Sequence, residues 1–111
     1  MSCIFCKIAS KEVPSDIVYE TDTVVAFRDL NPQAPVHILV IPRKHVSGIH
    51  EADGGTGLEE LMLSAAEVAR REEIEDAGYR LVINCGRQGG QTVDHLHVHV
   101  LGGRAMSWPP G

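Results

Sequence analysis

The sequence has no excess of basic residues, no long apolar run and no even set of cysteines. Ten Lys and Arg stand against fifteen Asp and Glu, and the net charge of −5 argues against binding to long nucleic acids or anionic membranes. The longest nearly apolar run, residues 34–42, contains His37 and is less than half a bilayer span. No export signal precedes Lys7. We therefore expect a cytoplasmic protein with neither nucleic-acid nor membrane partners.

The three cysteines, Cys3, Cys6 and Cys85, do not form an even disulfide set, which favours a reducing compartment. Cys85 stands in an apolar run and is expected to be a small buried side chain. The spacing of Cys3 and Cys6 lets two thiolates reach one metal ion. Two reduced thiols packed on the core are the alternative.

The chain length of 111 residues fits one domain spanning residues 1–111. Runs of β-branched and aromatic residues predict five strands, at residues 17–20, 24–28, 36–41, 79–85 and 95–101. The first two strands are close enough in sequence to form a hairpin.

One long helix is predicted between the third and fourth strands. Apolar side chains recur at helical spacing from Leu58 to Ala69, Thr56 and Glu59 match a capping box, and Gly78 is a natural stop. The order of elements predicts an α+β domain with a mainly antiparallel five-stranded sheet and one long helix on a face.

Three of the six histidines alternate with apolar residues in the last predicted strand. Because alternate side chains of a strand share a face, His95, His97 and His99 are expected on one side and the intervening apolar residues on the other. A half-exposed strand that happens to carry histidines is the alternative. Three imidazoles at period two favour a chemical role instead.

Imidazole is a nucleophile near neutral pH, and its second nitrogen can hold a hydrogen bond that fixes the tautomer. A neighbouring imidazolium neutralises a phosphate oxygen or protonates a leaving group. The glycine-rich residues 86–92 just upstream allow backbone N–H groups to approach an anion closely, although most such loops are plain turns. Together these features predict a phosphate site.

The pattern of residues 95–101, His-φ-His-φ-His-φ-φ, resembles the signature of the histidine triad (HIT) family of nucleotide hydrolases and transferases. The similarity runs from Ile4-Phe5 through residues 38–45 to the tail. Three segments are similar to the Hint branch, the purine nucleoside phosphoramidases: residues 31–35, 89–93 and 108–111. The resemblance implies a HIT-like fold with a short N-terminal helix besides the long one, in a homodimer whose sheets join across a two-fold axis.

The resemblance also implies catalytic roles for four histidines. His97 looks like the nucleophile that becomes nucleotidylated, and His99 would contact the α-phosphate oxygens and assist the leaving group. His95 would relay protons to His97 only if it holds no metal. His37 would support the triad by hydrogen bonding, or is otherwise a satisfied strand histidine.

The nucleotide-binding residues implied by the resemblance are spread over three loops. Asp29 would accept hydrogen bonds from the ribose hydroxyls and Leu30 would lie at the base, although a loop cap is the plainer interpretation of Asp29. Trp108 would reach toward the partner's site in the dimer. The phosphate and the nucleophile would be held by Asn84, Gly90, Gln91 and Thr92, and Asn84 alone would also pass as a strand-end polar residue.

The implied reaction is cleavage of the phosphorus–nitrogen bond of a purine nucleoside 5′-phosphoramidate. It would release AMP or GMP and an amine by two displacements through nucleotidyl-His97, with no catalytic metal. Cleavage of dinucleoside polyphosphates is an alternative within the family, and a low-turnover nucleotide-binding or interaction protein is an alternative outside enzymology. A pure binding module would not need an intact His97.

The pair Cys3 and Cys6 resembles that of family members with structural zinc, whose second pair of ligands corresponds to His45 and His95. Tetrahedral Cys₂His₂ coordination would close the site and tie the N-terminus to the sheet.

Overall fold

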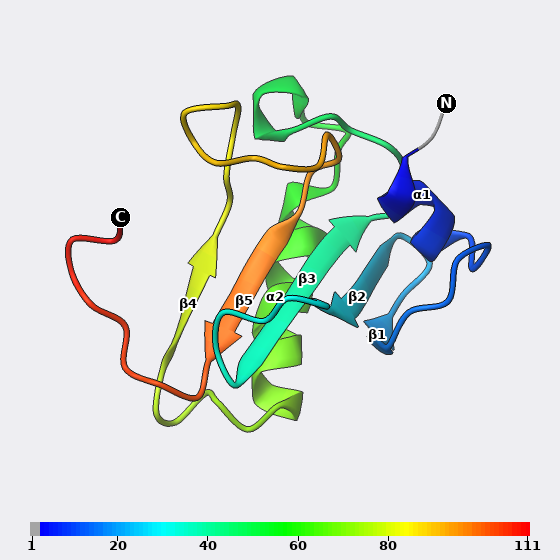
Figure 1. The fold of residues 1–111 in the computed structure, drawn as a ribbon. Helices are drawn as coiled ribbons and strands as arrows, with labels where there is room; N and C mark the ends of the chain where they lie inside the picture. The colour runs from blue at the N-terminus through cyan, green and yellow to red at the C-terminus, as the bar shows by residue number, and fades with distance from the viewer. Residues whose placement is uncertain (1–2) are drawn as a thin grey trace.

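Five strands form one antiparallel sheet in the order β1-β2-β3-β5-β4 (Figure 1), in a computed structural model that describes residues 3–111. The strands are β1 (Ile17–Glu20), β2 (Val24–Arg28), β3 (Val36–Pro42), β4 (Tyr79–Val82) and β5 (Val98–Gly102). The helices are α1 (Ile4–Ala9), the 3-10 turn η1 (Ile49–Glu51) and α2 (Leu58–Arg71). The predicted α+β architecture, including the short N-terminal helix, is confirmed.

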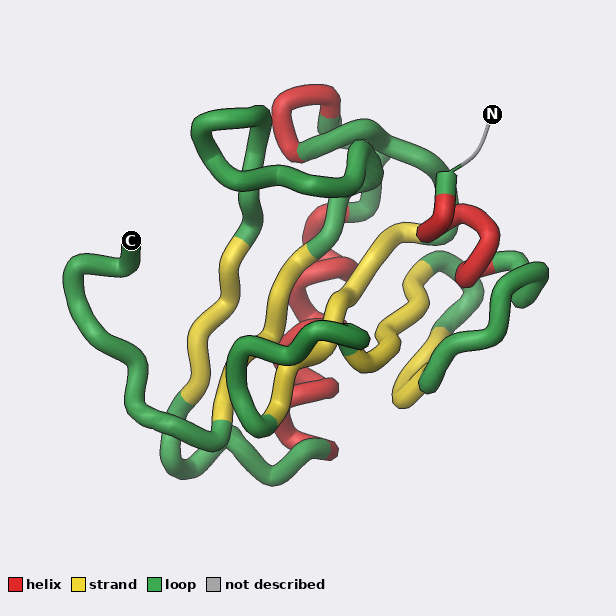
Figure 2. The backbone as a smooth tube through the Cα atoms, viewed as in Figure 1, coloured by secondary structure: helices red, strands yellow, loops and turns green. Residues whose placement is uncertain are grey.

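The two faces of the sheet are covered differently, as Figure 2 shows, with α2 running along one face and α1 at one end of the sheet. Alternation along β3 explains this arrangement. Ile38 and Val40 belong to the core under α2, whereas Leu39 and Ile41 pack with the apolar side chains of α1. The second, smaller core therefore lies on the face opposite α2.

None of the helices in residues 3–111 is long and apolar enough to cross a membrane.

The predicted bounds of the long helix are wrong at both ends. At the start, the Thr56 hydroxyl accepts the N–H of Asp53 in the preceding turn, so the helix begins after Gly57 without a side-chain cap. At the end, Glu73 adopts a left-handed φ of 59°, and the N–H of Ile74 reaches the carbonyl of Ala69. This is a Schellman motif in which glutamate occupies the position usually held by glycine. The helix therefore stops at Arg71, well before Gly78.

The last two strands are shorter at one end than predicted, because each loses its partner there. Pairing of β5 starts at Val98, opposite Val40 of β3, since the N–H of the preceding Leu96 donates to Val46 instead. In the register of β4 with β5, residues 84 and 85 would face residues 97 and 96, which precede β5, and pairing of β4 ends at Val82. His95 and His97 thus precede the paired part of β5.

Candidate functional site

A cavity of about 270 Å³ opens on the sheet face that carries α1. Its polar lining residues include His97 and His99 of the triad segment and Asp29 of the loop after β2, besides Ser15, Arg28 and Thr92. The rest of its wall is mainly apolar, with Ile4, Phe5, Ile8, Val13, Phe27, Leu30 and Leu39 among the lining residues. An apolar hollow with a few convergent polar groups is typical of a small-molecule site.

The three triad imidazoles project to one side of the segment, as the alternation predicted. Phe5, on the α1 side, packs edge-on against the rings of both His95 and His97, and the His97 and His99 ring centroids are 5.0 Å apart. The intervening Leu96 and Val98 are buried in the opposite core under α2. The cavity takes in only the second and third histidines, whereas His95 is fully buried beside it.

The tautomer of His97 follows from its backbone partner. Its Nδ1 lies 2.7 Å from the carbonyl oxygen of His95. A carbonyl only accepts, so Nδ1 carries the proton and donates it. The neutral ring therefore keeps a free lone pair on Nε2. His97 can thus act as a nucleophile toward a group bound in the cavity.

A series of hydrogen bonds through His37 gives His99 the opposite tautomer to that of His97, with the proton on Nε2. The backbone N–H of Gln33 donates to His37 Nδ1 at 3.0 Å, so the proton of the neutral His37 ring is on Nε2. His37 Nε2 lies 2.9 Å from His99 Nδ1 and donates to it. The proton of His99 is therefore on Nε2, which makes His99 a hydrogen-bond donor for an anion or a leaving group. His37 thus makes the hydrogen bond to the triad that the expected supporting role would need.

Burial keeps these two rings neutral. Desolvation lowers the pKa of His37, opposed by the charge of Asp29, and lowers the pKa of His99 to about 4, with further lowering by His97 and His37. Asp29 Oδ2 lies 3.4 Å from His37 Nε2. Asp29, His37 and His99 are close enough together to hold a metal, but the proton assigned to His37 Nε2 occupies the position that a metal would need.

Asp29 fits both interpretations that the sequence allows. Its Oδ1 accepts the backbone N–H of Asn31 at 2.8 Å, which is a loop cap, and its side chain also lines the cavity. Leu30 lines the cavity as well and is 99% exposed. Both residues are thus positioned to contact a ligand.

The glycine-rich loop is braced by its own amide side chains. Asn84 donates to the carbonyl of Gly89, and Gln91 donates to Ser47 and Val93 while accepting the N–H of Gly86. Of the four loop residues expected to hold the phosphate, only Thr92 lines the cavity. Asn84, Gly90 and Gln91 lie outside its lining, and the two amides hold the shape of the loop that leads to Thr92.

Trp108 also lies outside the cavity lining. Its ring is 81% exposed and stands beside Arg80 of β4, whose guanidinium carbon lies 5.9 Å from the ring centroid. The tail that carries it leaves the body of the molecule on the β4 side (Figure 1). Within one chain Trp108 therefore contributes nothing to the cavity.

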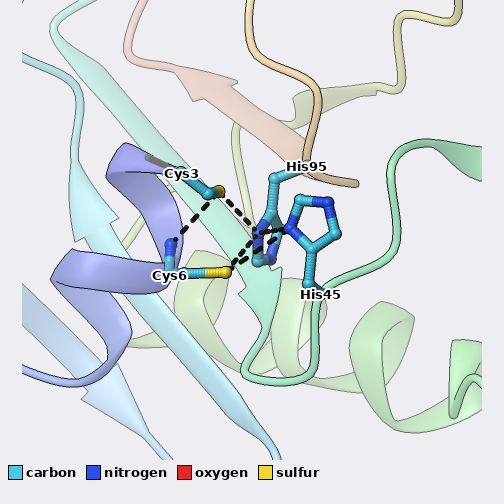
Figure 3. Close-up of side chains that lie close together, drawn as sticks. All are labelled: Cys3, Cys6, His45 and His95. Carbon is cyan, nitrogen blue, oxygen red and sulfur yellow. Dashed lines mark hydrogen bonds between the residues drawn. The ribbon is translucent and has the colours of Figure 1, made fainter. Parts of the chain in front are cut away.

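Four possible metal ligands converge beside the triad (Figure 3). Cys3 and Cys6 come from the start of α1, His45 follows β3, and His95 is the first triad histidine; one donor atom from each lies within 4.8 Å of the others. His95 Nδ1 is 3.3 Å from Cys3 Sγ, 3.5 Å from Cys6 Sγ and 3.2 Å from His45 Nδ1. The four residues are those that the resemblance implied.

The donor set fits zinc. His95 Nε2 lies 2.8 Å from the carbonyl of Pro42 and donates its proton there, which leaves Nδ1 as a lone pair facing the thiols. A carbonyl on the far nitrogen is the usual way in which a metal-binding imidazole is oriented. Burial raises the pKa of the Cys6 thiol, and the neighbouring Cys3 raises it further, so a thiolate pair here calls for a cation. Two cysteines and two histidines form a closed tetrahedral set of the structural kind.

Two features of the site region were missed or wrong in the sequence interpretation. The apolar cavity wall from α1 was missed, since Ile4 and Phe5 gave no signal beyond hydrophobicity. Cys85 is not a buried hydrophobe: it is half-buried, and its Sγ lies 3.3 Å from Nδ1 of the exposed His50. The turn after β4 exposes residue 85, and nothing in the local sequence shows this.

The HIT domain family matches residues 10–106. A 14 kDa zinc-binding protein of Brassica juncea is 53% identical over 97% of this chain and 98% of its own, and an uncharacterized HIT-like protein of Synechococcus elongatus is 53% identical over 97% and 96%. A solved HIT family hydrolase of Legionella pneumophila superposes with a TM-score of 0.96 at 46% identity, covering 99% of this chain and all of that one.

Proposed function

The chain belongs to the HIT domain family, and from this premise we propose that it hydrolyses purine nucleoside 5′-phosphoramidates at the phosphorus–nitrogen bond. The observation that carries the proposal is the pair of opposite tautomers at the cavity. His97 keeps a lone pair on Nε2 and His99 keeps a proton on Nε2. A nucleophile next to a hydrogen-bond donor that stabilises the charge developing on phosphate oxygens and the leaving nitrogen suits displacement of an amine from phosphorus.

The first displacement forms a bond between His97 Nε2 and the α-phosphorus and breaks the bond from phosphorus to the amine. The amine nitrogen leaves with a proton taken up from solvent, which the attack of water in the second step returns, while the neutral His99 ring donates its Nε2–H as a hydrogen bond to the leaving nitrogen or to a phosphate oxygen and keeps its proton. Water then attacks the phosphorus, and nucleotidyl-His97 is released as the nucleoside monophosphate and free imidazole. The apolar wall suits a purine base, and Asp29 at its edge suits ribose hydroxyl donors.

We propose in addition that the Cys3, Cys6, His45 and His95 cluster holds a structural Zn²⁺. The zinc-binding name of the Brassica relative and the donor geometry support this. With its side chain on the metal and its Nε2–H on Pro42, His95 cannot relay protons to His97. The catalytic work then falls on His97 and His99, and no catalytic metal is needed.

The test is release of AMP from adenosine 5′-phosphoramidate, followed by chromatography, with intact-protein mass measured during turnover. Wild-type protein should release AMP and show a nucleotidyl adduct, and His97→Ala should lose both. The His99→Ala variant should be slower by about 10²–10³-fold, the usual effect of removing one preorganised hydrogen-bond donor.

His50→Ala is the matched control, because His50 is an exposed histidine outside the cavity lining. It should keep wild-type turnover. Unchanged turnover in His97→Ala would refute the assigned nucleophile. Faster cleavage of a diadenosine polyphosphate than of the phosphoramidate would favour the alternative substrate class, and AMP binding without turnover of either would favour a binding protein.

A further inference from the structure

The short helix α1 belongs to the metal cluster and to the cavity at once. Cys3 caps its start and Cys6 lies in its first turn, and both are candidate metal ligands. Ile4, Phe5 and Ile8 of the same helix line the cavity. Metal ligands and cavity wall thus alternate within six consecutive residues.

Phe5 makes the closest link between the two sites. It stands between the cysteines in sequence and is only 6% exposed. Its ring centroid lies 6.0 Å from that of His95 and 5.1 Å from that of His97, both in edge-on geometry. One aromatic side chain therefore touches a metal ligand and the nucleophile.

The position of α1 depends on what holds it. A helix of six residues is far too short to be stable in water by itself. Apart from the metal cluster, it is held by the small core formed by Phe5, Ile8 and Ala9 against β2 and β3. Removing a metal that joins Cys3 and Cys6 to His45 and His95 would leave those apolar contacts and, at the far end of the helix, the hydrogen bond from Arg43 Nη1 to the Ala9 carbonyl.

We propose that the metal centre positions the nucleotide pocket through α1, so that metal binding and nucleotide binding strengthen each other, with Phe5 as the positioning residue. The inference rests on the proposed nucleotide function and adds a regulation to it: the pocket is fully formed only in the metal-loaded protein. Since coupling between two sites is reciprocal, each ligand must raise the affinity for the other by the same factor.

The test uses AMP and Zn²⁺ as the two probes. AMP affinity is measured by calorimetry for the zinc-loaded protein and for the chelated protein, and zinc affinity is measured with and without AMP by competition with a chromophoric chelator. We expect a factor of about ten in both directions, within the usual range for coupled sites. Histidine ring NMR signals give a readout that does not involve turnover, because moving the Phe5 ring changes the shift of His97.

Two variants separate this coupling from a simple loss of pocket wall. Phe5→Ala should bind zinc at unchanged stoichiometry, but zinc should no longer raise its affinity for AMP, nor AMP its affinity for zinc. Phe5→Leu is the milder substitution and should show the same loss. Leu39→Val alters the same cavity from β3, so it should weaken AMP binding while the ratio between loaded and chelated protein stays as in wild type.

The possible failures can be told apart. Equal AMP affinity with and without zinc would overturn the coupling alone. Coupling that persists in Phe5→Ala and Phe5→Leu would overturn the role of Phe5. A zinc-loaded protein that binds no AMP would overturn the proposed function, and the coupling with it.

Discussion

Each triad imidazole has one nitrogen bound to another part of the fold, and this decides what its other nitrogen can do. The His95 carbonyl accepts a hydrogen bond from His97 Nδ1–H, and the Pro42 carbonyl accepts one from His95 Nε2–H. The tautomer of His99 is determined by the hydrogen bond that it accepts from His37. The tautomer of His37 is determined in turn by the hydrogen bond from the backbone N–H of Gln33. Three histidines of identical chemistry are thereby left with a lone pair on Nε2 of His97, a proton on Nε2 of His99 and a lone pair on Nδ1 of His95 that faces the thiols.

Stability should fall in acid because of the buried histidines. The pKa of His99 is lowered by burial to about 4, so the unfolded chain, with an ordinary histidine pKa, binds protons more readily between about pH 6.5 and 4. The free energy of unfolding should fall through this window by about 3 kcal/mol on account of His99. Urea unfolding at pH 7.5, 5 and 4 measures it.

His99→Gln is the comparison, because it removes the titrating ring and keeps a hydrogen-bonding side chain. Its unfolding free energy should depend less steeply on pH than that of wild type in the same window. Identical dependence in both proteins would show that other groups carry the acid effect.

At this scale the sequence predicted which residues come together better than how each ring is oriented and protonated. The alternation of His95, His97 and His99 was enough to place them on one side. Their tautomers depend on carbonyl and N–H groups of distant residues, which no local pattern contains. The same holds for the contact between Cys85 and His50.

At the scale of elements, type and order were predictable and ends were not. Apolar periodicity located α2, but its end depends on Glu73 in a left-handed conformation and on Ile74 returning to the core. The strand ends depend on pairing, as where Leu96 bonds to Val46 rather than to β3. Ends are decided by tertiary partners, and a single sequence carries little information about those.

Gly102→Ala should destabilise the protein at the junction of β5 and the end of α2. A Cβ there would lie 2.6 Å from Ile74 Cδ1 and 3.0 Å from its Cβ. Overpacking of this kind costs about 1–3 kcal/mol, which thermal or urea unfolding would detect. Gly54→Ala should be nearly neutral, since nothing lies within 4 Å of the added carbon.

A second change tests the cause. Ile74→Val removes the Cδ1 atom that the new methyl would meet, so it should recover part of the stability lost in Gly102→Ala. If the double variant is less stable than the sum of the single changes predicts, the clash with Ile74 is not the cause.

At the scale of the whole molecule, the candidate metal ligands come from three separate parts of the chain. Cys3 and Cys6 lie at the start of α1, His45 lies in the loop after β3, and His95 lies in the triad segment. The Cys3→Ser, Cys6→Ser double variant should lose bound zinc. Its free energy of unfolding should fall by about 3–4 kcal/mol, the effect of removing a ligand present at 100 to 1,000 times its dissociation constant. Metal analysis and urea unfolding of fresh protein measure both.

Cys85→Ser is the matched control, since Cys85 lies outside the metal cluster. It should keep the metal and the stability of wild type. Equal zinc content in the double variant and wild type would refute the proposed ligands.

The molecule should also pair with a second copy of itself. Strands β1 and β4 are the edges of the sheet, and an exposed edge strand presents unpaired N–H and C=O groups. Joining the β4 edges of two copies about a two-fold axis would pair the N–H and C=O groups of β4. It would also bring each exposed Trp108 toward the other copy. Sedimentation should give twice the 12.1 kDa of one chain. A fully active monomer would remove any role for Trp108 in the partner's site.

His95 serves two purposes with different atoms, because its ring faces the thiols while its carbonyl holds His97. Substituting the two cysteines would therefore take away ligands of the proposed metal while leaving unchanged the residue whose carbonyl orients His97.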